Sequence, residues 1–314
     1  TAMAGAAMAM AGRIYSDYDK DFADDCLKRA KAVWKYLSKE KESIYRVDEG
    51  QESGSGAYND TDDATERCWL AAELFRTTGD KKYENYLMKQ QKNTILQKPS
   101  FFTWDNTLAL AQFSYGMAAN ANHDFQLQVR QKLVDYANDI ANTIKNDGYG
   151  CSLKAHEYTW ASTKNAVTKG DILLMAYQFE AKPEYIDGAL DQIHYMFGRN
   201  ALNKSFMTGM GENPPEHPHN RIHESTGAYV PGLVVGGPNA VSGGDPDQTK
   251  YIEECKPAPA KCYLDVLMSW STNEYAIDYN GAGIYALSYF MQPDKSITAK
   301  DLKLNRSFPK WSFE

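Results

Sequence analysis

The amino-acid sequence predicts an all-α fold. Along most of the 314-residue chain, apolar residues recur at three- and four-residue steps, which is the pattern of an amphipathic helix. Segments with the alternating pattern of a β-strand are scarce. The periodic segments follow one another through short polar turns, such as residues 78–81 and 146–148, so neighbouring helices are expected to pack antiparallel. These observations indicate a layered architecture built from helices.

Helices are expected from the first residues onward. Residues 1–12 are small and apolar, but they lack the basic start of a signal peptide and an initiator Met, so we interpret them as a helix. In residues 17–40, Cys26, Ala30 and Val33 mark one helical face. The same spacing predicts further helices over residues 64–77, 82–96, 106–119, 125–146, 166–179, 185–197, 263–270 and 282–290.

One long stretch, residues 198–244, breaks the helical pattern. It is rich in Gly, Pro, Asn and His, and a loop of more than about 15 residues inside a compact domain is uncommon and usually functional. No linker composition divides the chain, so we expect residues 1–314 to belong to a single domain.

The composition excludes several classes of protein. The chain has 34 Lys and Arg against 41 Asp and Glu, a net charge of −7, with no basic cluster, which argues against nucleic acid or an anionic membrane surface as a partner. No apolar run approaches the roughly 18 residues that span a bilayer. The 21 Tyr, 12 Phe and 6 Trp residues suit a groove that holds sugar rings, and packing in the core is the alternative use for them.

Three polar residues are candidates for chemistry. Glu274 stands among aromatic and apolar residues, where partial burial would favour its neutral form and let it donate a proton. A capping or ion-paired role is the alternative. His219 and Arg221 lie two residues apart in a proline-rich segment, so an extended backbone would direct both to one side, where they could hydrogen-bond to hydroxyls or orient a carboxylate.

Two metal sites are conceivable. A calcium site could form in the acidic turn before a predicted helix, completed by backbone carbonyls of residues 53–56, although acidic residues also suit any helix N-terminus. Its candidate ligands are Asp60, Asp62, Asp63 and Glu66. A zinc site is the weaker alternative, because prolines preclude the helix on which such histidine pairs are carried. Its candidate ligands are His217, His219, His223 and Glu224.

The remaining candidates are aromatic residues and a pair of cysteines. Trp104, Trp160 and Tyr279 could each stack on a sugar face or lie in the core. Cys255 and Cys262 flank a proline-rich loop and could either form a disulfide in an exported protein or remain free thiols.

Several motifs resemble the C-terminal half of glycoside hydrolase family 9, whose members are chiefly endo-acting cellulases. The acidic, Trp-containing helix of residues 64–80, which ends in Thr-Gly-Asp, is similar to a helix of the family. The later motifs that carry the resemblance are residues 195–200, 205–209, 218–221, 231–239 and 272–280.

The resemblance implies an (α/α)6 barrel with an open cleft, and hydrolysis of β-1,4-glucan with inversion at the anomeric carbon. It implies a secreted enzyme that needs no cofactor for its chemistry and can hold a structural Ca²⁺ near residues 53–66. Carried over by motif, Glu274 is the general acid. The residues assigned to substrate binding are His219, Arg221, Tyr279, Trp160, Trp104 and Asn273.

One element of the family pattern is absent from these residues. An inverting glycosidase needs a second carboxylate as general base, with the two carboxyl groups roughly 6.5–9.5 Å apart. The family supplies it from an Asp-x-Gly-Asp motif, which this sequence does not contain. We therefore expect an N-terminally incomplete barrel whose base and first helices reside on another segment or a second chain, and which is inactive alone. The alternatives are a non-catalytic β-glucan-binding fragment, or the same toroid acting on xyloglucan or mixed-linkage glucan.

Overall fold

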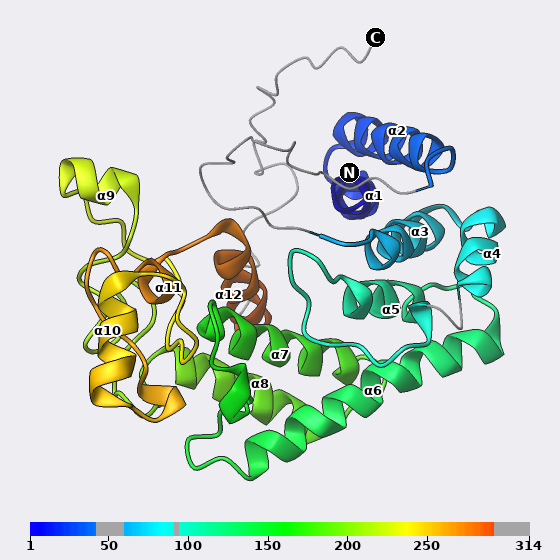
Figure 1. Cartoon of the computed structure of the whole chain (residues 1–314). Helices are drawn as coiled ribbons and strands as arrows, with labels where there is room; N and C mark the ends of the chain where they lie inside the picture. The colour runs from blue at the N-terminus through cyan, green and yellow to red at the C-terminus, as the bar shows by residue number, and fades with distance from the viewer. Residues whose placement is uncertain (42–59, 91–93, 292–314) are drawn as a thin grey trace.

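A computed structural model describes residues 1–41, 60–90 and 94–291, and these residues form a helical structure (Figure 1). In this described part, β-structure is limited to isolated bridges. The helices are α1 (Ala2–Ile14), α2 (Lys20–Leu37), α3 (Ala64–Thr78), α4 (Lys81–Lys89), α5 (Leu108–Gly116), α6 (His123–Lys145), α7 (Ser162–Tyr177), α8 (Pro183–Met196), α9 (Arg221–Thr226), α10 (Pro246–Cys255), α11 (Trp270–Asn273) and α12 (Ile277–Phe290), with short 3-10 turns η1 (Tyr15–Asp17), η3 (Ala155–Glu157) and η4 (Pro259–Lys261).

The helices form two layers. Helices α1, α3, α5, α7 and α12 contact one another in that order, and α2, α4, α6 and α8 each pack on the preceding helix of this inner row. The pairs follow one another around an arc from α1 and α2 to α12, while α9, α10 and α11 gather beyond one end of it (Figure 1). A helix of the inner row can be covered on all sides: in α7, every residue from Ser162 to Ala176 is buried. The predicted all-α architecture is confirmed.

Local sequence signals set the helix ends. The side chains of Asp19, Asp80 and Asn122 accept hydrogen bonds from backbone N–H groups in the first turns of α2, α4 and α6, which satisfies donors that have no partner within the helix. Helix α3 ends at Gly79, whose φ of 70° is a left-handed conformation that glycine adopts without strain. These signals produce the short turns between antiparallel neighbours.

The prediction of a helix over residues 263–270 is wrong. Residues 263–269 are irregular, and only the single turn of α11 begins at Trp270. The apolar residues that suggested a helix include Tyr263, which instead packs into a cluster with Phe206. Side-chain hydrogen bonds, such as that from Thr272 Oγ1 to the Leu264 carbonyl (3.0 Å), take the place of helical ones.

Two short helices were not predicted. Helix α10 was missed because its sequence carries no apolar stripe, and in the structure it buries only Gln248. Pro246 in its first turn is a typical helix start and was an available signal. Helix α9 interrupts the long stretch of residues 198–244, which is otherwise irregular as expected.

The two ends of the inner row leave apolar side chains exposed. Helix α12 has a single charged residue, Asp278, yet Ile277 is 95% exposed and Ile284 is 67% exposed. On α1, Met3 and Ile14 are exposed. A helix that is apolar on all sides is normally buried on all sides, so these faces suit contact with further protein. Among the described helices, none combines the length and apolar character that a bilayer span requires.

Replacement of Gly116 by Ala should destabilise the intact protein by about 1–3 kcal/mol, because an added Cβ would lie well inside van der Waals contact with Phe179 Cζ. The Phe179 ring is held by Phe113 (centroids 5.9 Å apart) and by the Arg130 guanidinium (5.2 Å), so it cannot move away freely. Denaturant unfolding measures the effect.

Gly148→Ala is the control, since no heavy atom lies within 4 Å of the added Cβ, and it should change stability by less than about 0.5 kcal/mol. Equal stability of the two variants would contradict the proposed packing of Gly116.

Candidate active site

Three segments that are distant in the sequence meet at Glu274. Glu274 follows the last residue of α11 in an extended conformation (φ −62°, ψ 144°) and forms a parallel bridge with His219. Its carbonyl accepts a hydrogen bond from the Gly236 N–H (2.9 Å), and the next residue, Tyr275, bridges Val235. The long irregular stretch is therefore joined to the α11 segment at the residue predicted to be the acid.

The surroundings of Glu274 favour its neutral form. Burial raises the pKa of the Glu274 carboxyl above its ordinary value, while the charge of His219 and a hydrogen bond from Trp160 act in the opposite direction. The charge of Asp245 raises the pKa further. A half-buried carboxyl of this kind can hold a proton at a higher pH than an exposed glutamate does.

His219 has a defined orientation. Its Nδ1 lies 2.6 Å from the Leu267 carbonyl, which can only accept, so Nδ1 carries the hydrogen and Nε2 is the nitrogen available to another partner. Its backbone N–H donates to the Asn273 carbonyl (2.9 Å), and the ring packs edge-on against Trp270 with centroids 6.1 Å apart.

Arg221 is exposed at the first turn of α9. Asn220, between His219 and Arg221, is extended (φ −157°, ψ 141°), which is the conformation assumed in the sequence-based expectation for this pair.

The aromatic candidates differ in position. Trp160 is 40% exposed and hydrogen-bonds Glu274, whereas Trp104, which is 41% exposed, lies in a separate turn closed by Thr103 and Asn106. Tyr279 is only 8% exposed and belongs to a core cluster, which favours the core alternative over the substrate-binding role that the resemblance implied.

Asn273 also differs from its expected role. It is fully buried, its side-chain oxygen accepts from the Tyr263 hydroxyl, and its NH₂ group donates to the His217 carbonyl (3.1 Å) and to Asp265 (3.1 Å). An amide whose donors and acceptor are satisfied inside the protein is not free to bind a substrate, so Asn273 supports the site from within.

A concave surface lies next to the segment that carries Glu274. A pocket of about 590 Å³ begins at the next residue, Tyr275, and includes Asn220, which separates His219 from Arg221. Its other lining residues are mostly apolar or small: Leu233, Ala276, Ile277, Asn280, Gly281 and Ile284. The pocket therefore adjoins the two segments that carry Glu274 and His219, and its volume is of a size suited to small molecules.

The described residues do not support either metal site. No three of their His, Cys, Asp and Glu side chains gather in a group that could hold a metal. Asp63 pairs with Arg67 (2.8 Å), the carboxylate of Asp62 accepts the Ala64 N–H (2.9 Å), and burial raises the pKa of Glu66 to about 7. The expected carbonyl ligands at residues 53–56 lie outside the described residues.

The cysteine alternative is settled in favour of free thiols. Cys255 is exposed, Cys262 is buried, and neither forms a disulfide. Burial raises the pKa of the Cys262 thiol, which makes it a poor nucleophile.

Three charged residues near the site were not among the sequence candidates. Asp245 is fully buried, accepts hydrogen bonds from Ser269 (3.1 Å) and Ser271 (2.9 Å), and acts on the Glu274 pKa. Lys204 and Asp265 form a largely buried ion pair (2.9 Å). None stands in a periodic pattern or a motif, and only the fold brings them together.

Comparison with known proteins identifies relatives over most of the chain. The family model for glycosyl hydrolase family 9 matches residues 1–287. Endoglucanase D of Acetivibrio thermocellus is 32% identical over 287 residues, covering 90% of this chain and 43% of its own length. Cellulose 1,4-beta-cellobiosidase of the same organism is 31% identical over 318 residues, covering 92% of this chain and 35% of its own.

Solved structures share the fold. The crystal structure of the family 9 endoglucanase J30 superposes with a TM-score of 0.88 at 38% identity, covering 93% of this chain and 54% of that one. This similarity confirms the expected (α/α)6 class of fold. The chain spans about half the length of the relatives that it matches, or less.

Replacement of Trp160 by Phe should raise the pKa of Glu274 further, because the hydrogen bond from Trp160 favours the charged carboxylate. Titration of ¹³C-labelled glutamate by NMR measures the shift. Trp69→Phe is the matched control and should leave the Glu274 pKa unchanged, since the Trp69 ring nitrogen donates to Glu73 on its own helix (3.4 Å). A lowered Glu274 pKa in the Trp160 variant would refute the assigned interaction.

Proposed function

The chain belongs to glycosyl hydrolase family 9, and from this premise we propose that it forms the acid-bearing part of an endo-β-1,4-glucanase that inverts the anomeric configuration. The observation that carries the proposal is the half-buried Glu274 carboxyl with its raised pKa, held beside an exposed Trp160 and the oriented ring of His219. The names of the two relatives from Acetivibrio thermocellus support a β-glucan as the substrate.

Each residue has a distinct role in the proposed mechanism. Neutral Glu274 donates its proton to the glycosidic oxygen as the bond to the leaving sugar breaks, and the resulting carboxylate is stabilised by the hydrogen bond from Trp160. The face of Trp160 stacks on a glucose ring. His219, through Nε2, and Arg221 hydrogen-bond to sugar hydroxyls, which orients the bond to be cleaved.

The general base is proposed to come from a segment outside these residues. Water attacks from the face of the sugar opposite the acid, which requires a carboxylate roughly 6.5–9.5 Å from Glu274. The exposed apolar faces of α1 and α12 support the view that the same segment, in this chain or a second one, packs at the two ends of the arc. Because a glucan polymer cannot cross a membrane, we further propose that the enzyme acts outside the cell.

Replacement of Glu274 by Gln in the complete enzyme should lower turnover of native glucan by orders of magnitude and leave binding largely intact, because the amide keeps the shape but cannot donate the proton. Reducing-sugar release and calorimetry with cellohexaose measure the two effects. In the parent enzyme, turnover should fall as the pH rises through the pKa of Glu274, since only the neutral acid is active.

The exposed Glu253 on α10 offers a matched control, and Glu253→Gln should retain full turnover. Unchanged turnover in the Glu274 variant would refute the acid assignment. Binding of cellohexaose without any product in the parent protein would instead favour a non-catalytic glucan-binding role.

Mass spectrometry of the active preparation should find protein beyond these 314 residues, either as a longer chain or as a second polypeptide. The physical reason is that the proposed base and the cover for the exposed α12 face must both be supplied. A single species with the mass of these residues alone and full activity on carboxymethylcellulose would overturn this part of the proposal.

A further inference from the structure

The segment that carries His219 has few backbone donors. Residues 214–219 include three prolines, which have no N–H, so only Glu216, His217 and His219 can donate. The N–H of Glu216 and the N–H of His217 both donate to the carboxylate of Asp265, to different oxygens and each at 2.9 Å. The N–H of His219 donates to the Asn273 carbonyl (2.9 Å). A single side chain thus holds two of the three donors.

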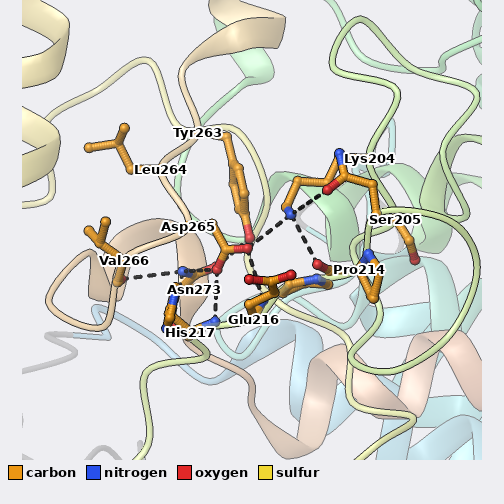
Figure 2. Close-up of polar contacts among 12 residues, drawn as sticks. Lys204, Ser205, Pro214, Glu216, His217, Tyr263, Leu264, Asp265, Val266 and Asn273 are labelled. Carbon is orange, nitrogen blue, oxygen red and sulfur yellow. Dashed lines mark hydrogen bonds and ion pairs between the residues drawn. The ribbon is translucent and has the colours of Figure 1, made fainter.

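The Asp265 carboxylate is surrounded by donors. Figure 2 shows it between the Lys204 ammonium on one side and the Asn273 amide on the other, with the backbone of Glu216 and His217 beneath. Lys204 lies 2.9 Å from one oxygen, and Asn273 lies 3.1 Å from the other. Burial opposes ionisation, yet the hydrogen bonds from Lys204 and the two N–H groups hold the pKa of Asp265 below its ordinary value.

The carbonyls of the same segment are held as well. Lys204 donates to the Pro214 carbonyl (3.0 Å), Tyr229 donates to the Pro215 carbonyl (2.6 Å), and Asn273 donates to the His217 carbonyl (3.1 Å). Residues 214–219 form no helix or strand. Side chains from three other regions of the chain hold them in place instead.

We propose that Asp265 is a positioning residue for the acid part of the site, which fixes residues 214–219 so that His219 lies beside Glu274. It acts through two routes: directly through the backbone of the segment, and through Asn273, which immediately precedes Glu274 in the chain. The kinetic consequence rests on the proposed glucanase function, whereas the fixing of the segment does not.

Asp265→Asn in the complete enzyme tests the proposal. Each oxygen of Asp265 accepts two donors, so an amide NH₂ in either orientation faces donors and cannot bond to them. Hydrogen exchange measured by mass spectrometry should become faster at the amides of Glu216, His217 and His219. Because a shift of about 1 Å in a substrate-positioning group can cost about 100-fold, kcat/KM on glucan should fall by up to roughly that factor.

Glu84→Gln is the matched control. Glu84 is a buried carboxylate on α4 that accepts from Lys81 (2.7 Å), from the Tyr115 hydroxyl (2.9 Å) and from the backbone N–H of Asn122 (2.5 Å), away from the site. Its loss should lower the melting temperature while leaving both kcat/KM and exchange at residues 214–219 unchanged. A loss of kcat/KM in this control equal to that in the Asp265 variant would assign the effect to general destabilisation and overturn the proposal.

A double-mutant cycle with His219→Ala separates positioning from a merely structural role. If Asp265 acts partly through His219, then Asp265→Asn should cost less kcat/KM when His219 is absent than when it is present, and the remaining cost is that of the route through Asn273. An equal cost in both backgrounds would overturn the proposal. Should Asp265→Asn not fold, Lys204→Gln removes one of the four partners and should change exchange and kcat/KM in the same direction to a smaller extent.

The exchange measurement tests the fixing of residues 214–219 separately from the proposed glucanase function. Unchanged exchange at residues 214–219 in Asp265→Asn would overturn the positioning role whatever the activity. Faster exchange at residues 214–219 in Asp265→Asn, combined with a complete parent protein that cleaves no glucan, would support the fixing of the segment and refute the proposed glucanase function instead.

Discussion

The constraint on which the site depends is that irregular backbone inside a protein must find hydrogen-bond partners without a helix or a sheet. Around Glu274 these partners are side chains. Asp265 accepts two consecutive backbone N–H groups, and Asn273 holds carbonyls of two separate segments. Gln248, on a helix with no other buried residue, donates to the carbonyls of Asn239 and Cys262 (2.8 and 2.9 Å). Buried side-chain amides and the Asp265 carboxylate thus supply the hydrogen bonds to the backbone that regular secondary structure supplies in the helical arc.

Two carboxyl groups near each other in the chain show how environment separates their roles. Glu274 is half-buried with few donors near it, so burial dominates and its pKa rises. Asp265 is also partly buried, but an ammonium group and two N–H groups face it, so its pKa falls. The same chemical group is thereby suited to proton donation at one position and to service as a fixed anion at the other.

The sequence predicted the helical arc well because its helices owe their positions to apolar periodicity and to local capping residues. The prediction failed where side chains pack inward from irregular backbone. Tyr263 follows a helical spacing without lying in a helix. For Tyr279 the sequence left a sugar-stacking and a core position open, and the residue lies in a core cluster. Asn273 stands next to the candidate acid in sequence, yet its side chain faces the interior. Asp265 carries no sequence signal, because its partners come from regions that only the fold brings together.

The contacts within the helical arc and those within the site also differ in sequence separation. Each outer helix packs on the inner helix that precedes it, so these hairpins join neighbouring parts of the chain and can form in the order in which the ribosome releases them. The site joins Asn273 to His217 across 56 residues and Asp265 to Glu216 across 49. During synthesis, the helices as far as α8 can therefore pack before the segment that contains Glu274 exists, whereas the site and α12 can assemble only afterwards.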